Sequence, residues 1–96
     1  MPLVSHFYGV LIRMFFKDTD KHNKPHFHAV YNEFSASYSL DGELLSGSMP
    51  SKQQKLIIAW ATLRQDELFA LWRILQENGE YFSIKGLEWF LWFLDQ

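Results

Sequence analysis

Hydrophobic and polar residues alternate with a period of two in the first half of the chain. From Phe34 to Leu40 every second residue is apolar, and serines fill the positions between. Because successive side chains of a strand point to opposite faces, this pattern predicts a strand with one buried and one polar face. A second strand, His26 to Tyr31, precedes it, and Asn32-Glu33 is expected to form a two-residue hairpin turn between them.

One register between these two strands gathers their apolar residues on a single face. On that face it pairs Tyr31 with Phe34, Ala29 with Ala36, and Phe27 with Tyr38. On the opposite face it pairs Val30 with Ser35, His28 with Ser37, and His26 with Ser39. A slip by one residue would mix the two sets, so we predict this register for the hairpin.

Two further strands complete a predicted four-stranded antiparallel meander over residues 1–46. His6 to Phe16 is apolar on both alternating faces except at Arg13, which is typical of a central strand. Asp41-Gly42 is a second turn signal, and a short strand from Glu43 to Ser46 follows it.

Apolar residues recur at helical spacing over residues 50–78. Ser48 or Ser51 is the candidate N-cap, and Asn78-Gly79 is a natural stop. The polar residues 64–67 interrupt the pattern, and Asp66 could cap a second helix, but the apolar phase continues across them. We therefore predict one long helix, with a kink allowed, that packs on the Phe27 face and leaves the histidine face more open.

Residues 80–96 are predicted to add an edge strand, Tyr81 to Lys85, and an apolar tail, Leu87 to Gln96. The tail is apolar nearly all round, so we expect it to be buried against its own sheet or against another chain. The predicted class is a single α+β domain over residues 1–96. It has an antiparallel sheet of four or five strands and one long helix on one face.

Composition excludes several classes of function. The 96 residues contain no cysteine, so disulfides, thiolate metal sites and cysteine nucleophiles are excluded. A net charge of −2 disfavours a broad nucleic-acid surface, although a local patch would be compatible with it. The longest apolar block is far shorter than the roughly 20 residues that span a bilayer, and residues 1–6 lack a signal-peptide pattern. We expect a cytoplasmic protein without a membrane segment.

His26 and His28 carry the sharpest chemical signal. They lie two residues apart on a predicted strand, so both point to one face with α-carbons roughly 6.5 Å apart. Two such imidazoles can converge on a divalent transition metal such as zinc, which also needs at least a third ligand. The candidate third ligands are His6, His22, Asp18 and Asp20.

The same pair also suits acid–base catalysis on a phosphodiester. One imidazole would act as general base and the other as general acid, and Arg13 would stabilise the oxyanion if it shares their face. That chemistry would make the protein a ribonuclease or another hydrolase. The simplest alternative is a solvated sheet face, on which His–Ser pairs form hydrogen bonds across strands.

Several segments together resemble one small bacterial and archaeal family, known as domain of unknown function 4160. The resemblance covers about Met1 to Asn78. It rests on Ser5-His6-Phe7-Tyr8-Gly9, on Pro25-His26-Phe27-His28-Ala29 with its His-Phe-His motif, and on Gly42-Glu43-Leu44-Leu45-Ser46-Gly47 followed by Pro50, Trp60-Ala61 and Glu67-Leu68. Such proteins are often encoded beside another short protein, as in toxin–antitoxin-like modules, which implies a protein partner.

We therefore predict a small interaction module of a toxin–antitoxin-like pair. It would bind a small protein or a second copy through the open sheet face, the sheet edge or the aromatic tail. The alternative is a histidine-dependent enzyme or a metal-binding protein that uses His26 and His28.

Overall fold

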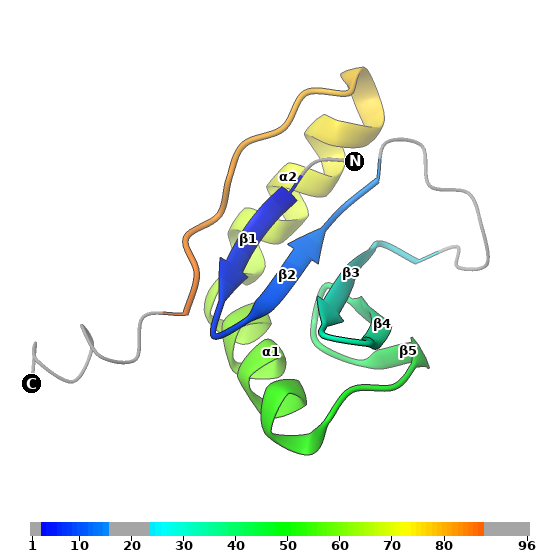
Figure 1. Ribbon diagram of the computed structural model, residues 1–96. Helices are drawn as coiled ribbons and strands as arrows, with labels where there is room; N and C mark the ends of the chain where they lie inside the picture. Colours follow the sequence, from blue (N-terminus) through cyan, green and yellow to red (C-terminus); the bar gives the residue numbers. More distant parts are fainter. Residues whose placement is uncertain (1–2, 16–23, 88–96) are drawn as a thin grey trace, which may run out of the picture.

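The computed structural model describes residues 3–15 and 24–87 and confirms the α+β class. One antiparallel sheet contains five strands in sequential order, and two helices follow it in the chain (Figure 1). The elements are β1 (Leu3–Phe7), β2 (Val10–Arg13), β3 (His26–Tyr31), β4 (Phe34–Ser39), β5 (Leu44–Gly47), α1 (Ser51–Leu63) and α2 (Gln65–Asn78).

The β3–β4 hairpin has the predicted register at all six pairs. Phe27 lies opposite Tyr38 on the inner face, and His28 lies opposite Ser37 on the outer face. Asn32 in the turn adopts a left-handed conformation, with φ of 51°, which asparagine tolerates better than most residues. The pairing of apolar side chains therefore predicted the geometry of the hairpin correctly.

The prediction of a single strand from His6 to Phe16 is wrong, because the chain turns back at Tyr8-Gly9. Both turn residues have positive φ, 47° and 81°, and they join β1 to β2. Phe7 and Val10 face each other across this hairpin and therefore share a face, although residues three apart in one strand would lie on opposite faces. The apolar character on both alternating sets came from two strands, each with its own inner face.

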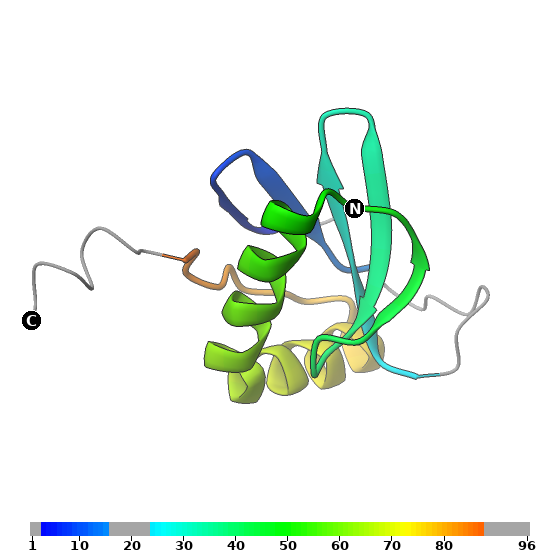
Figure 2. The same ribbon diagram turned by 90° about the horizontal axis from the view of Figure 1, so that it is seen from below.

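The prediction of one long helix is also wrong. The chain leaves helical geometry at Arg64, with φ of −109° and ψ of 23°, and α1 and α2 run in clearly different directions (Figure 2). A straight helix over these 28 residues would be about 42 Å long, roughly twice the length of a six-residue strand. The bend keeps the apolar stripes of both halves on the sheet.

The start of the helical region differs from the prediction, whereas its end agrees with it. Pro50 is the N-cap of α1, so neither Ser48 nor Ser51 is the cap. Gly79 ends α2 as predicted, in a left-handed conformation with its N–H bonded to the Leu75 carbonyl oxygen.

The core lies between the inner face of the sheet and the two helices. At its centre, Phe27 stacks on Tyr38 with ring centroids 5.6 Å apart and meets Trp60 edge to face at the same distance. The Tyr38 hydroxyl donates a hydrogen bond of 3.0 Å to Gln54, and burial raises the pKa of this phenol. The hairpin and α1 are thus joined by aromatic packing.

Tyr81 to Lys85 does not form the predicted edge strand, but it does lie beside β1. The Ile84 N–H donates to the Val4 carbonyl oxygen at 2.8 Å, and Trp60 Nε1–H donates to the Lys85 carbonyl oxygen at 2.8 Å. The predicted tail beyond Leu87 lies outside the described residues. One edge of the sheet is therefore covered by the chain's own later segment.

Gly47 and Gly42 allow a test of the tight approach of β5 to β4. Both have positive φ, but a Cβ at Gly47 would lie 2.3 Å from the Ser35 carbonyl oxygen, whereas one at Gly42 would meet only Ile58, at 3.5 Å. We expect Gly42→Ala to lower the free energy of unfolding by about 1–2 kcal/mol, from backbone strain alone. Gly47→Ala should lower the free energy of unfolding by about 3 kcal/mol or more, because the backbone of β4 must also move away from the new methyl group. Urea unfolding measures both, and equal losses would contradict this packing.

Candidate functional site

A polar row crosses four strands of the outer face at one level. Arg13 on β2 pairs with His28 on β3, His28 pairs with Ser37 on β4, and Ser37 pairs with Ser46 on β5. Direct cross-strand partners share a face, so all four side chains belong to the outer face. We call these four residues the polar row.

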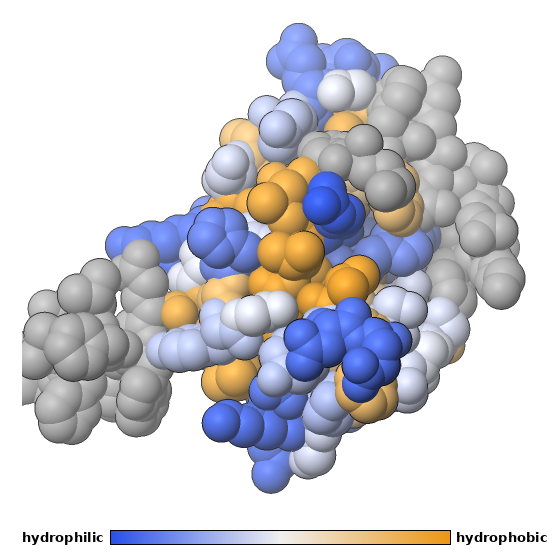
Figure 3. All heavy atoms as spheres, viewed as in Figure 1, coloured by the Kyte–Doolittle hydropathy of each residue, from blue (hydrophilic) through white to orange (hydrophobic). Residues whose placement is uncertain are grey.

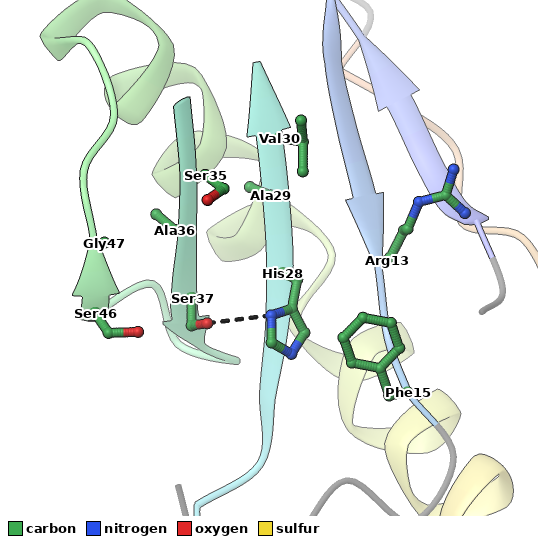
Figure 4. Close-up of a pocket in the computed structure, with 10 residues that line it drawn as sticks. All are labelled: Arg13, Phe15, His28, Ala29, Val30, Ser35, Ala36, Ser37, Ser46 and Gly47. Atoms are coloured by element: carbon green, nitrogen blue, oxygen red, sulfur yellow. Dashed lines mark hydrogen bonds between the residues drawn. The ribbon is translucent and has the colours of Figure 1, made fainter. Parts of the chain in front are cut away.

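The polar row borders an open hollow of about 300 Å³ (Figure 4). Its lining residues are Arg13, Phe15, His28, Ala29, Val30, Ser35, Ala36, Ser37, Ser46 and Gly47. The hollow arises from a difference in side-chain size. Arg13 of β2, Phe15 after the end of β2, and His28 and Val30 of β3 line one side, whereas serines and a glycine of β4 and β5 line the other.

The His28 ring is contacted on one side by Ser37 of the polar row and on the other by Phe15. Its Nδ1 shares a 3.2 Å hydrogen bond with the Ser37 hydroxyl, and its ring lies 4.4 Å from the Phe15 ring centroid. Arg13 shares the face, as the oxyanion hypothesis required, but Figure 4 shows its guanidinium directed away from the imidazole. The structure therefore brings His28 and Ser37 together and leaves Arg13 at the rim.

His26 does not lie on an open surface, so the expectation of an open histidine face is wrong at this position. Its side chain is only 1% exposed, and its ring lies 5.5 Å from that of Trp72 on α2. Its Nδ1–H donates to the Lys24 carbonyl oxygen at 2.9 Å. The end of α2 reaches this part of the sheet because of the bend at Arg64.

The two histidine rings are close enough to share a ligand. Their centroids lie 5.1 Å apart, and the bond to Lys24 leaves the lone pair of neutral His26 on Nε2. Within residues 3–15 and 24–87, however, no group of three potential metal-binding side chains occurs. Two imidazoles fall short of the three or four protein ligands that zinc takes.

The proposed third ligands are not brought to this pair in the described part of the chain. His6 lies on β1, two strands away from β3, which is a separation of about 10 Å before any offset along the strands. Asp18, Asp20 and His22 lie outside the described residues. The metal hypothesis therefore keeps two ligands with known positions, His26 and His28.

Ser39, the partner of His26 across the hairpin, belongs to the following turn. Its hydroxyl donates to the Asp41 carboxylate and accepts a 3.0 Å hydrogen bond from the Glu43 N–H. The bond from Ser39 lowers the pKa of Asp41. Of the two serines opposite the histidines, Ser37 alone is hydrogen-bonded to one of them in the described structure.

Sequence reasoning missed several residues of the hollow and its border. Phe15 was assigned to a strand and Trp72 to the apolar stripe of the helix. Ser46 was the end of a predicted strand and Gly47 part of the family resemblance, and none of the four was predicted to belong to a site. The sequence did contain one signal for two of these residues. Ser46 and Gly47 follow the Asp41-Gly42 turn, so they must lie beside β4. Figure 3 shows hydrophobic residues grouped near the centre of this view and flanked by hydrophilic ones.

Comparison with known protein families gives a match. The model of a family described as Domain of unknown function (DUF4160) matches residues 9–73. No curated protein and no solved structure matches significantly. Among the described residues, neither helix has the length and apolar character needed to cross a membrane.

The Ser39–Asp41 bond predicts how stability depends on pH. A carboxyl group with a lower pKa in the folded chain stabilises the fold above its unfolded pKa of about 3.9, and this contribution is lost as the pH falls through the folded pKa. We expect Ser39→Ala to reduce the loss of stability below pH 4. Urea unfolding between pH 2 and 6 measures this, and an unchanged pH dependence in the variant would contradict it.

Proposed function

The chain belongs to the family of Domain of unknown function (DUF4160), and we propose that it binds a small partner protein through the outer face of its sheet. The observation that carries this proposal is the open hollow beside the polar row. α1 packs on the inner face and Trp72 of α2 covers His26 at one end of the outer face, whereas the hollow beside His28 is open in the described structure. Its wall contains an arginine and a phenylalanine, and both residue types are enriched in protein interfaces.

The outer face is a better docking surface than either sheet edge. Residues 81–87 lie along the β1 edge, where Ile84 donates its N–H to Val4. The β5 strand has four residues and contains an extra residue, Leu45, between the partners of Ser37 and Tyr38. Short edge strands and bulges hinder the addition of another strand. A partner would therefore contact side chains of the face.

The resemblance to the family also favours a protein partner. What the resemblance implies is a gene that lies beside that of another short protein, as in toxin–antitoxin-like modules. The product of the adjacent reading frame is therefore the partner that we propose. The net charge of −2 argues against a nucleic-acid strand as the main ligand.

Co-purification of the two adjacent gene products tests this proposal. We expect the two proteins to form a complex. Its dissociation constant should rise about tenfold or more in Arg13→Ala and in His28→Ala, because truncating a residue at the centre of an interface commonly costs more than 1 kcal/mol of binding free energy. Arg73→Ala is the matched control, since it removes the same side chain from an exposed position on α2. Absence of a complex, or equal weakening by Arg73→Ala, would refute the proposal.

A second candidate function is metal binding, alone or in a histidine-dependent hydrolase. The observation that favours it is the 5.1 Å separation of the rings of His26 and His28, with Nδ1 of each already hydrogen-bonded. This arrangement resembles the supported imidazoles of metal sites, in which Nε2 binds the ion.

Zinc titration by calorimetry tests the second candidate. It predicts about one zinc ion per chain, with binding lost in the His26→Ala/His28→Ala double variant and retained in His6→Ala. Nickel serves as a second probe. Absence of binding, or binding that survives the double substitution, would remove these two histidines as a metal centre.

A further inference from the structure

We infer that the apolar tail of the chain packs on the outer face of its own sheet, with Trp89 and Trp92 over Leu11 and Val30. Residues 88–96 lie outside the described part of the chain. The described part nevertheless points to this contact in three ways: an exposed apolar row on the outer face, the place where the described chain ends, and the distance between the two.

The apolar row crosses the outer face one level away from the polar row. Leu11 on β2 lies directly opposite Val30 on β3, and each is two residues from a member of the polar row, so it shares that face. Leu11 is 37% exposed and Val30 is half-buried. Val30 and Phe15 also line the hollow, so apolar surface continues from the row into it. Contiguous exposed apolar surface commonly marks a site of contact.

The described chain ends beside this row. Gly86 lies against β1, where a Cβ would approach the His6 carbonyl oxygen to 2.6 Å (Figure 1). His6 is the cross-strand partner of Leu11, so the residues after Gly86 begin level with the apolar row. The interior beside this point is filled by Phe7 and the fully buried Trp60, whose rings lie 5.4 Å apart. The tail therefore has to continue over the surface.

The tail has the composition and the reach to cover the row. Residues 89–94 are all apolar or aromatic and carry no charge, and an aromatic side chain buries about 150–250 Å². Val30 is two strand spacings from the β1 edge, about 10 Å. Trp89 and Trp92 are three and six residues beyond Gly86, so an extended chain carries them up to about 10 and 20 Å. Both rings can therefore reach the row or the hollow.

The surface of α1 is a poorer place for the tail. Its exposed large apolar residues, Ile58 and Leu63, lie five positions apart, whereas neighbours on one face of a helix are three or four apart. Leu11 and Val30 are direct cross-strand neighbours and give one continuous contact. A second copy of the chain is also a poorer partner, because a short covalent connection gives the tail a high effective concentration at its own sheet.

This contact gives the tail a role beyond the proposed function. In the free chain it would keep the apolar row out of water. Because the same face is the docking surface proposed above, the tail would also compete with the partner protein for it.

Nuclear Overhauser spectroscopy on the full chain, with no partner present, tests the inference. The sample is deuterated except for the leucine and valine methyl groups and the aromatic rings. We expect contacts from the indole protons of Trp89 and Trp92 to the methyl groups of Leu11 and Val30, and none to Leu63 on α1.

Two variants of the full chain provide the comparison. Trp89→Gln/Trp92→Gln should abolish these contacts and shift the methyl signals of Leu11 and Val30, because the aromatic rings leave the row. Tyr81→Gln is the matched control, since it removes a 52% exposed aromatic side chain that precedes the tail, and it should leave the signals unchanged.

Three outcomes would overturn the inference. Contacts to Leu63 with none to the sheet would place the tail on α1. Contacts between labelled and unlabelled chains in a mixed sample would mean that a second copy supplies the tail. Absence of contacts, with methyl signals unchanged in the double variant, would exclude the packing altogether. Because no partner is present, none of these outcomes decides whether the complex with the adjacent gene product forms.

Discussion

The register between β3 and β4 is the constraint on which the rest of the structure depends. It places Phe27 and Tyr38 on the inner face, where they stack at 5.6 Å and receive Trp60 of α1. The same pairing places His28 beside Ser37 on the outer face. A shift by one residue would turn the serines of β4 toward the helices and the aromatic rings toward the outer face, so one choice of pairing determines both the core and the candidate site.

The parts of the fold that the sequence predicted are those set by local alternation. The β3–β4 hairpin, the turn at Asp41-Gly42 and the helix stop at Gly79 all follow from neighbouring residues. The incorrect predictions concern features that depend on packing between residues far apart in the sequence. At Tyr8-Gly9 the apolar pattern continues through a turn. At Arg64 the helix is interrupted although its apolar phase continues, because a straight helix would extend beyond the sheet.

The same distinction applies to the candidate site. The pairing of His28 with Ser37 was readable from the hairpin alone, whereas the burial of His26 depends on Trp72, which α2 brings to the sheet from 46 positions later in the chain. The polar row lies entirely within the matched residues 9–73. The edge strand β1 and residues 81–87, which lie along it, are outside the matched residues. The proposed docking surface therefore belongs to the part of the chain that the family shares.

The most direct test of the outer face as the docking surface is cross-saturation NMR on the complex with the adjacent gene product. The chain would be deuterated and the partner left protonated, so that saturation passes only to amides at the contact. The account predicts intensity losses at residues 11–13, 28–30, 35–37 and 46–47. Losses concentrated on the exposed sides of α1 and α2, with these strands unaffected, would contradict it.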